Sequence, residues 1–217
     1  MEPILRTTYE TDWITLVIFG SLFLVLIAKS LFYTRFFNFI ILPFNNKYIF
    51  MYNKKEKLFN WFHIFFTLFQ VINTSLFIYL AWRAFLKQEN QEYAFLFPAI
   101  LIGFFLFLIL KVFLQLGNGF IFGSSQIFSE LVFKKLSYLN YAGIVLFIAN
   151  IFLTYVLIDS KIVVSIAFLL FLIINVIGWV TVIKNSQKLL TGHFFYFILY
   201  LCALEIAPLL IVGSFLK

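Results

Sequence analysis

The fold is decided by stretches such as residues 93–116, which read YAFLFPAILIGFFLFLILKVFLQL. These 24 residues contain one charged side chain, Lys111, and show no alternation of polar and apolar positions. A helix rises about 1.5 Å per residue, so a run of this length crosses the roughly 30 Å hydrocarbon core of a bilayer. A transmembrane strand would instead show about ten residues of alternating polarity. The stretch therefore predicts a membrane-spanning α-helix.

Five more apolar runs of similar length predict five more spanning helices. Together the six spans lie at about 13–32, 61–85, 93–116, 139–158, 162–183 and 194–215. The composition agrees, because 64% of the residues are hydrophobic, 12% are charged and the mean hydropathy is +1.04. A water-soluble protein of this size needs more polar surface. We expect an all-α membrane protein, with residues 1–217 forming one polytopic bundle of six transmembrane helices.

Basic residues are divided unevenly between the loops. The first, third and fifth loops hold eleven of the sixteen Lys and Arg residues, when helix-end residues are assigned to the nearer side. By the positive-inside rule these loops are cytoplasmic and both termini face outward. We interpret Lys54, Lys55, Lys57, Lys134 and Lys135 as contacts to membrane lipid or to a cytoplasmic partner, and no nucleic-acid partner is expected.

Glu205 is the first candidate for a functional residue, because an ionisable side chain at a helix centre costs about 2.5 to 3.5 kcal/mol to insert. It lies beside Pro208, which frees a backbone carbonyl group in the last predicted helix. Two interpretations stay open: a proton or cation relay, and a bond between helices. Lys111 is a candidate partner, since both residues would lie inside the same membrane boundary. If they pair, Lys111→Met combined with Glu205→Met restores part of the stability that either single change removes.

Four uncharged polar residues are predicted to hold helices together. Gln70 and Asn73 are three positions apart and therefore share one face of the second span. Asn150 and Asn175 lie in the fourth and fifth spans. Such side chains form hydrogen bonds across helix interfaces inside membranes.

Glycine and serine residues at 117–125 predict a helix break at the membrane surface. They do not form a phosphate loop, because the Gly-Lys-Ser/Thr ending is missing. After the break we expect a short interfacial helix at 126–136, with apolar side chains facing inward and Lys134 and Lys135 at its carboxyl end.

The sequence contains no pattern typical of a catalytic or metal site. Its two histidines, His63 and His193, lack the spacing of a zinc motif, and Cys202 is the single cysteine. No Ser-His-Asp arrangement is recognisable. We therefore expect no catalytic residue, no metal ion and no cofactor.

The run at 199–208, Leu-Tyr-Leu-Cys-Ala-Leu-Glu-Ile-Ala-Pro, resembles the closing signature of an uncharacterised family of integral membrane proteins from Bacteroidota, domain of unknown function 4271. The segment 111–123 resembles the central motif of that family. The resemblance implies a location in a bacterial inner membrane. It implies no activity, substrate or active-site residue.

Two functions remain open from the sequence. The first is a non-enzymatic subunit of a larger inner-membrane complex, with other membrane subunits as partners and protein export or insertion as one candidate role. The alternative is a small transporter or flippase that uses Glu205 near the bilayer midplane. An intramembrane enzyme acting on lipid-linked substrates has less support, because paired acidic residues are missing from the predicted cytoplasmic face.

Overall fold

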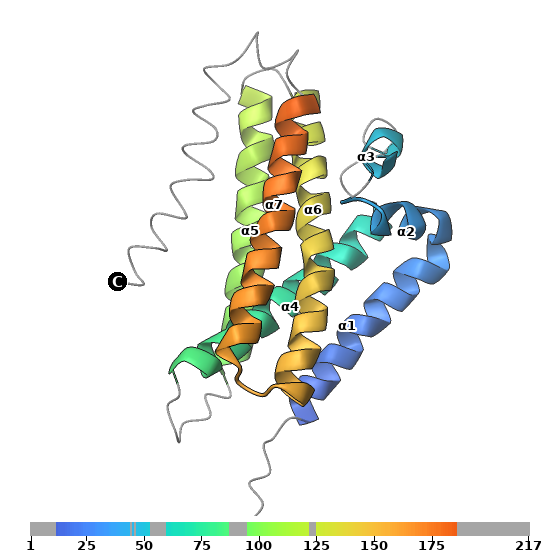
Figure 1. Cartoon of the computed structure of the whole chain (residues 1–217). Helices are drawn as coiled ribbons and strands as arrows, with labels where there is room; N and C mark the ends of the chain where they lie inside the picture. Colours follow the sequence, from blue (N-terminus) through green and yellow to red (C-terminus); the bar gives the residue numbers. More distant parts are fainter. Residues whose placement is uncertain are drawn as a thin grey trace, which may run out of the picture.

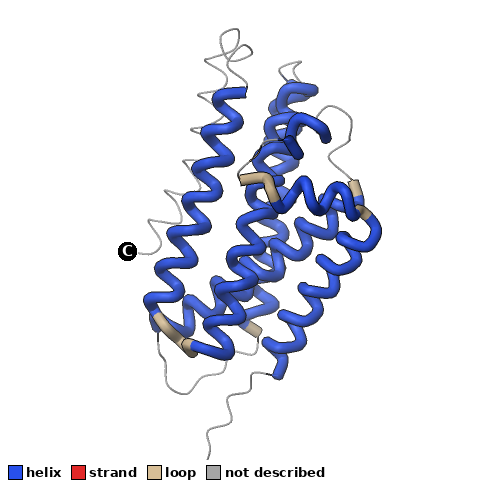
Figure 2. The backbone as a smooth tube through the Cα atoms, turned by 45° about the vertical axis from the view of Figure 1, so that its right-hand side comes forward, coloured by secondary structure: helices blue, strands red, loops and turns tan. Residues whose placement is uncertain are grey.

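The computed structural model describes residues 12–43, 45, 47–52, 60–86, 95–121 and 125–185. Within these residues helices are joined by turns and short loops and no strand is present, as the tube in Figure 2 shows. In chain order the elements are α1 (Asp12–Leu31), α2 (Tyr33–Ile40), α3 (Lys47–Tyr52), α4 (Trp61–Leu86), α5 (Leu96–Ile121), α6 (Ser125–Ile151), the π-helical turn η1 (Phe152–Val156) and α7 (Lys161–Asn185).

Five of the described helices are long and apolar enough to cross a membrane. The spans are Asp12–Leu31, Trp61–Phe85, Leu96–Gly117, Phe128–Val156 and Lys161–Thr181. This confirms an all-α, multi-pass membrane protein for the part of the chain that the structure describes. α1, α4 and α7 begin and end within two residues of the predicted spans. The sixth predicted span, 194–215, lies outside the described residues.

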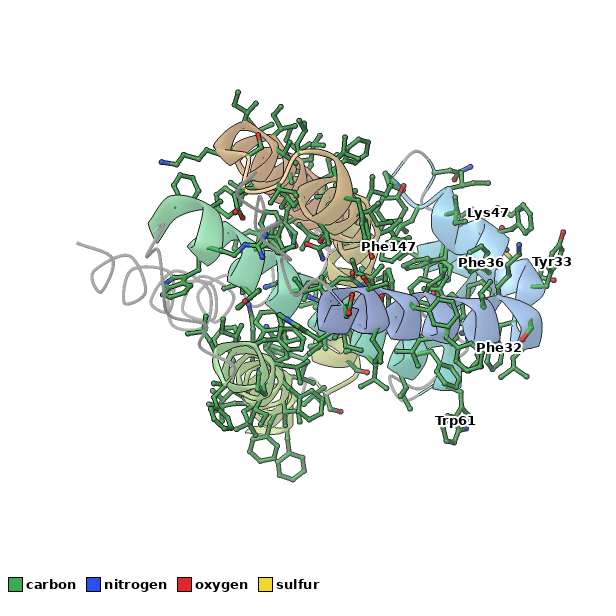
Figure 3. All side chains as sticks on the ribbon, turned by 90° about the horizontal axis from the view of Figure 1, so that it is seen from below. Phe32, Tyr33, Phe36, Lys47, Trp61 and Phe147 are labelled. Atoms are coloured by element: carbon green, nitrogen blue, oxygen red, sulfur yellow. The ribbon has the colours of Figure 1, made fainter. Side chains whose placement is uncertain are left out.

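α4 and α6 form the centre of the bundle. α4 packs against α1, α5 and α6, while α6 also packs against α5 and α7. In Figure 1, α5, α6 and α7 run roughly parallel, with α6 packed against both of the others, and α1 and α4 run obliquely to them. In the membrane-spanning part of α4, 56% is buried inside the protein. The corresponding share is 6% for α5 and 17% for α7. The outer helices therefore present apolar side chains to lipid, and Figure 3 shows such side chains around the bundle.

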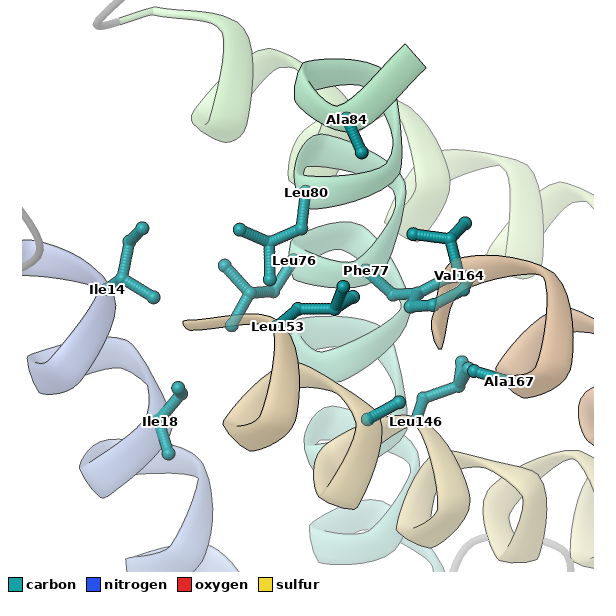
Figure 4. Packing of buried hydrophobic residues seen from close by; sticks show 11 residues of the cluster. Ile14, Ile18, Leu76, Phe77, Leu80, Ala84, Leu146, Leu153, Val164 and Ala167 are labelled. Atoms are coloured by element: carbon teal, nitrogen blue, oxygen red, sulfur yellow. The ribbon is translucent and has the colours of Figure 1, made fainter. Parts of the chain in front are cut away.

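Two hydrophobic clusters fill the interior. The aliphatic cluster joins α1, α4, the end of α6 and the start of α7, and Figure 4 shows it from close by; it contains Ile14, Ile18, Leu76, Phe77, Leu80, Ala84, Leu146, Ala149, Leu153, Val164 and Ala167. The aromatic cluster joins the other end of α1 to α2, α3, α4 and α6; it contains Ala28, Phe39, Leu42, Tyr48, Ile49, Phe62, Phe66, Phe69, Phe133 and Tyr138.

The predicted interfacial helix at 126–136 is wrong as a separate element. α6 runs without interruption from Ser125 to Ile151. Polar residues at the expected boundary lie inside the helix and donate hydrogen bonds there. Ser137 Oγ donates to the carbonyl oxygen of Phe133 at 2.8 Å, and Asn140 Nδ2 donates to Thr67 Oγ1 of α4 at 3.2 Å.

The predicted helix break also begins later than expected. α5 continues through Gly117 and Gly119 and ends at Ile121. A Cβ atom at Gly119 would lie 2.7 Å from Cβ of Phe128 in α6. Gly119 therefore allows two adjacent helices to approach closely, instead of ending the first one.

Candidate functional site

Two short helices cover the aromatic cluster. α2 contacts α1 and α3, and it buries Arg35 and Phe39, which are one helical turn apart and so share a face. α3 buries Tyr48 and Ile49. In Figure 1 both helices lie beside α6, towards the end of the bundle where α1 finishes. They bring a charged side chain from the first loop into the interior.

Arg35 is held between aromatic rings and is only 5% exposed. Its Cζ atom lies 4.4 Å from the ring centre of Tyr52 and 5.5 Å from that of Phe62. Ring faces attract cations, and the attraction is stronger where water is excluded. Burial lowers the pKa of Arg35, while the nearby Tyr48 acts in the opposite direction. Because a guanidinium group keeps its proton in proteins, a full positive charge stays at the junction of α2, α3 and α4.

Tyr48 connects this charge to His63. The Tyr48 hydroxyl lies 3.2 Å from His63 Nε2, and both residues are buried. Burial raises the pKa of Tyr48, so its hydroxyl remains neutral at physiological pH. Phe133 of α6 packs against both residues. Its ring centre lies 4.5 Å from that of His63, and its ring stacks against that of Tyr48. We call Arg35, Tyr48, Tyr52, Phe62 and His63 the capping site.

The sequence pattern does not indicate the capping site. Its members are separated by up to 28 positions, and no short motif joins Arg35 to His63. The four-residue spacing of Arg35 and Phe39 is the one local signal that these two side chains share a face. Nothing in the pattern indicates that this face is buried. His63 lies near the predicted start of the second span, and the structure buries it against α3 and α6.

A line of amide side chains runs between α4 and α6. Gln70, Asn73 and Asn150, all predicted to hold helices together, are fully buried. Asn150 Nδ2 donates to the backbone oxygen of Asn73 at 3.0 Å, whereas Gln70 Nε2 donates to Thr74 Oγ1 of its own helix, also at 3.0 Å. With the bond between Thr67 and Asn140, these contacts form what we call the amide seam: Thr67, Gln70, Asn73, Thr74, Asn140 and Asn150.

The two helices approach closely along the amide seam. A Cβ atom at Gly143 would lie 3.0 Å from the Cα atom of Gln70, so a side chain at this position of α6 would push against the backbone of α4. The amide oxygens of Gln70, Asn140 and Asn150 have no hydrogen-bond partner among the described residues. Buried acceptors are normally satisfied by protein groups or by water. The seam therefore has spare hydrogen-bonding capacity in the middle of the bundle.

The other predicted residues are dispersed. Asn175 Nδ2 donates to the carbonyl oxygen of Phe171 in its own helix at 2.8 Å, so this bond joins no second helix. The remaining candidates fall outside the described residues: Glu205, Pro208, Lys54, Lys55 and Lys57.

The predicted lysine contacts in α5 and α6 lie at similar depths. Lys111 is ten residues before the end of α5, and Lys135 is ten residues after the start of α6, so both lie about 15 Å from the same end of this hairpin. Lys135 Nζ lies 4.9 Å from the ring centre of Trp179 in α7, whereas Lys134 is buried.

The described residues contain no group of three or more His, Cys, Asp or Glu side chains that would hold a metal ion.

The family model for the Domain of unknown function (DUF4271) matches residues 14–216. The chain belongs to this family. The DUF4271 match starts in α1 and includes the capping site and the amide seam. No curated protein and no solved structure matches the chain.

Proposed function

We propose that the chain is a non-enzymatic subunit of a larger complex in a bacterial inner membrane. In this proposal six helices span the membrane, the lysine-rich loops face the cytoplasm and both termini face the periplasm. The ionisable side chains of the capping site take part in packing, as described above. The main support for a partner subunit comes from glycines on the outer helices.

Glycines in this bundle fall into two groups. The space beside Gly143 and Gly178 is filled by a neighbouring helix. A Cβ atom at Gly143 would lie 3.0 Å from Gln70, and one at Gly178 would lie 2.8 Å from Tyr138. Gly20 in α1 and Gly103 in α5 are exposed, and nothing lies within 4 Å of the position of a Cβ atom. In a helix interior glycine is about 1 kcal/mol less favourable than alanine. Close approach of a second helix offsets this cost at the filled positions and would do so at the open ones.

The test is purification of the full chain from its native membrane in a mild detergent, followed by mass spectrometry. We expect a second membrane protein in stoichiometric amount. Gly103→Leu should remove it, while the neighbouring control Ile102→Leu, which alters a side chain that is 57% exposed, should retain it. The identity of the recovered protein tests the narrower role in protein export or insertion.

Two results would contradict this proposal. Recovery of the unmodified chain as a lone monomer in full yield would show that the chain is not part of a stable complex. A lower melting temperature of the isolated chain with Gly103→Leu would show that another part of the same chain fills the face of α5.

A small transporter or flippase is the second candidate, and the amide seam favours it. Three buried amide oxygens without a described partner are suited to hold water or a passing cation between α4 and α6. In this alternative Glu205 acts near the bilayer midplane. Proton flux and lipid flipping should be measured with the chain reconstituted in liposomes. Transport that is unchanged by Glu205→Gln and by Asn150→Leu would exclude both features as its basis.

A further inference from the structure

α2 has three chemically different faces. Successive side chains of a helix are rotated by about 100°, so Arg35 and Phe39 point to one side, where both are buried. The opposite side is apolar and exposed. Its members, each between 41% and 61% exposed, are Tyr33, Phe37, Ile40 and the adjoining Ile41. Thr34 and Asn38 lie on the flank between these sides, and Asn38 Nδ2 donates to the carbonyl oxygen of Thr34.

The exposed apolar face continues a lipid-facing surface. α2 begins at Tyr33, two residues after α1 ends, and the last turns of α1 expose Leu26 and Leu31. In Figure 1, α2 runs across the direction of α5, α6 and α7, part-way along their length. Figure 3 shows Tyr33 at the outer edge of the molecule. The helix therefore has protein on one side and leaves its opposite, apolar side uncovered by the described residues.

The charges around α2 match an anionic lipid surface. Residues 13–52 contain no Asp or Glu. Lys29 near the end of α1 and Lys47 at the start of α3 are both exposed, so they flank α2 along the chain. Lysines beside a membrane surface attract anionic headgroups. Aromatic residues such as Tyr33 are enriched at the same level of membrane proteins.

We propose that α2 lies in the headgroup boundary of an anionic leaflet. Its face of Tyr33, Phe37, Ile40 and Ile41 contacts lipid, and the flank of Thr34 and Asn38 faces water. Lys29 and Lys47 bind lipid phosphate groups. In the folded chain, Arg35 stacks on Tyr52 and Phe39 packs in the aromatic cluster, and these contacts fix the rotation of α2 on the bundle.

The test uses the full chain with Cys202→Ser in nanodiscs of phosphatidylethanolamine and phosphatidylglycerol. A polarity-sensitive fluorophore is attached to a new cysteine, either Phe37→Cys on the apolar face or Thr34→Cys on the polar flank. We expect a spin label near the lipid headgroup to quench position 37 and aqueous iodide to quench position 34. Ile40→Cys provides a second apolar position if the Phe37 variant does not fold.

The charge requirement has its own measurement. Spin-labelled phosphatidylglycerol should quench position 37 more strongly than spin-labelled phosphatidylcholine, and Lys29→Gln with Lys47→Gln should remove the difference. Each lysine is expected to change relative lipid binding by about fivefold.

Three outcomes would overturn the proposal. Equal iodide quenching at positions 34 and 37 would mean that water covers the apolar face. Excimer emission from pyrene at position 37 would mean that a second copy covers it. If the preference for phosphatidylglycerol remains after both lysines are replaced, Lys29 and Lys47 do not bind the lipid phosphate groups.

Discussion

The two ends of the bundle are packed in different ways. The aliphatic cluster contains one aromatic residue, Phe77, whereas seven of the ten residues in the aromatic cluster are Phe or Tyr. The aliphatic end joins long membrane-spanning helices to one another. The aromatic end must also hold α2 and α3, which have eight and six residues and are too short to be stable alone.

This difference indicates how short helices are attached to a membrane bundle. Each aromatic ring buries more area than an aliphatic side chain, so a few rings can hold a small element. Their faces also accept the Arg35 cation, which fixes the orientation of α2. We infer that α2 and α3 form a unit that opens locally, while the aliphatic end belongs to the unit that unfolds globally.

The largest effects should come from truncating one buried residue at each end. Leu146→Ala removes a fully buried side chain of the aliphatic cluster, and Phe39→Ala removes one of the aromatic cluster. Each cavity costs about 2 to 5 kcal/mol. Leu146→Ala should lower the melting temperature of the whole chain, whereas Phe39→Ala should mainly increase hydrogen exchange and proteolysis in 33–52. Equal effects of both changes on all helices would show that the two ends form one cooperative unit.

The spanning helices were predictable because length and apolarity alone determine them in lipid. Gln70 and Asn73 were recognisable as a shared face for the same geometric reason. The start of α6 was not predictable, because hydropathy falls from Lys134 to Asn140. Asn140 there donates to Thr67 of α4, a partner 73 positions away that the local sequence does not reveal. The capping site depends on similar long-range contacts.

The next largest effect should come from Arg35. Arg35→Gln removes the cation from the rings of Tyr52 and Phe62, and the expected loss is about 2 kcal/mol for a desolvated cation–π contact. Arg35→Lys should recover less than half, because an ammonium group cannot stack as a planar guanidinium does. Hydrogen exchange of α2 and α3 measures both variants, with Lys161→Gln at the exposed start of α7 as control. Full rescue by lysine would mean that charge alone anchors α2.

Tyr48→Phe should have a smaller effect that depends on pH. At neutral pH the loss of the hydrogen bond to His63 costs about 1 kcal/mol. Burial raises the pKa of Tyr48 above its ordinary value of 10.0, so the unfolded chain loses this proton first as pH rises. Native stability contributed by the neutral hydroxyl is therefore present below pH 10 and is lost above it. Unfolding curves of both proteins should converge in alkaline buffer, and parallel curves would show that Tyr48 ionises freely in the folded chain.

The smallest effect is expected at the aliphatic end, where Arg83 and Asp159 form an ion pair. Arg83 Nε lies 2.7 Å from Asp159 Oδ1, and their side chains are 27% and 22% exposed. Partly exposed pairs contribute about 0.2 to 1 kcal/mol and are screened by salt. Asp159 has a φ of 55°, a region that Asn also adopts, so Asp159→Asn removes the charge without adding backbone strain.

A double-mutant cycle with Arg83→Gln and Asp159→Asn measures this coupling directly. We expect about 0.5 kcal/mol at low ionic strength and less in high salt. The ion pair joins the end of α4 to the turn before α7, so its loss should leave the aliphatic cluster intact. A coupling free energy as large as the loss of stability caused by Arg35→Gln would mean that a polar contact also holds the aliphatic end. The two ends would then differ only in their side-chain composition.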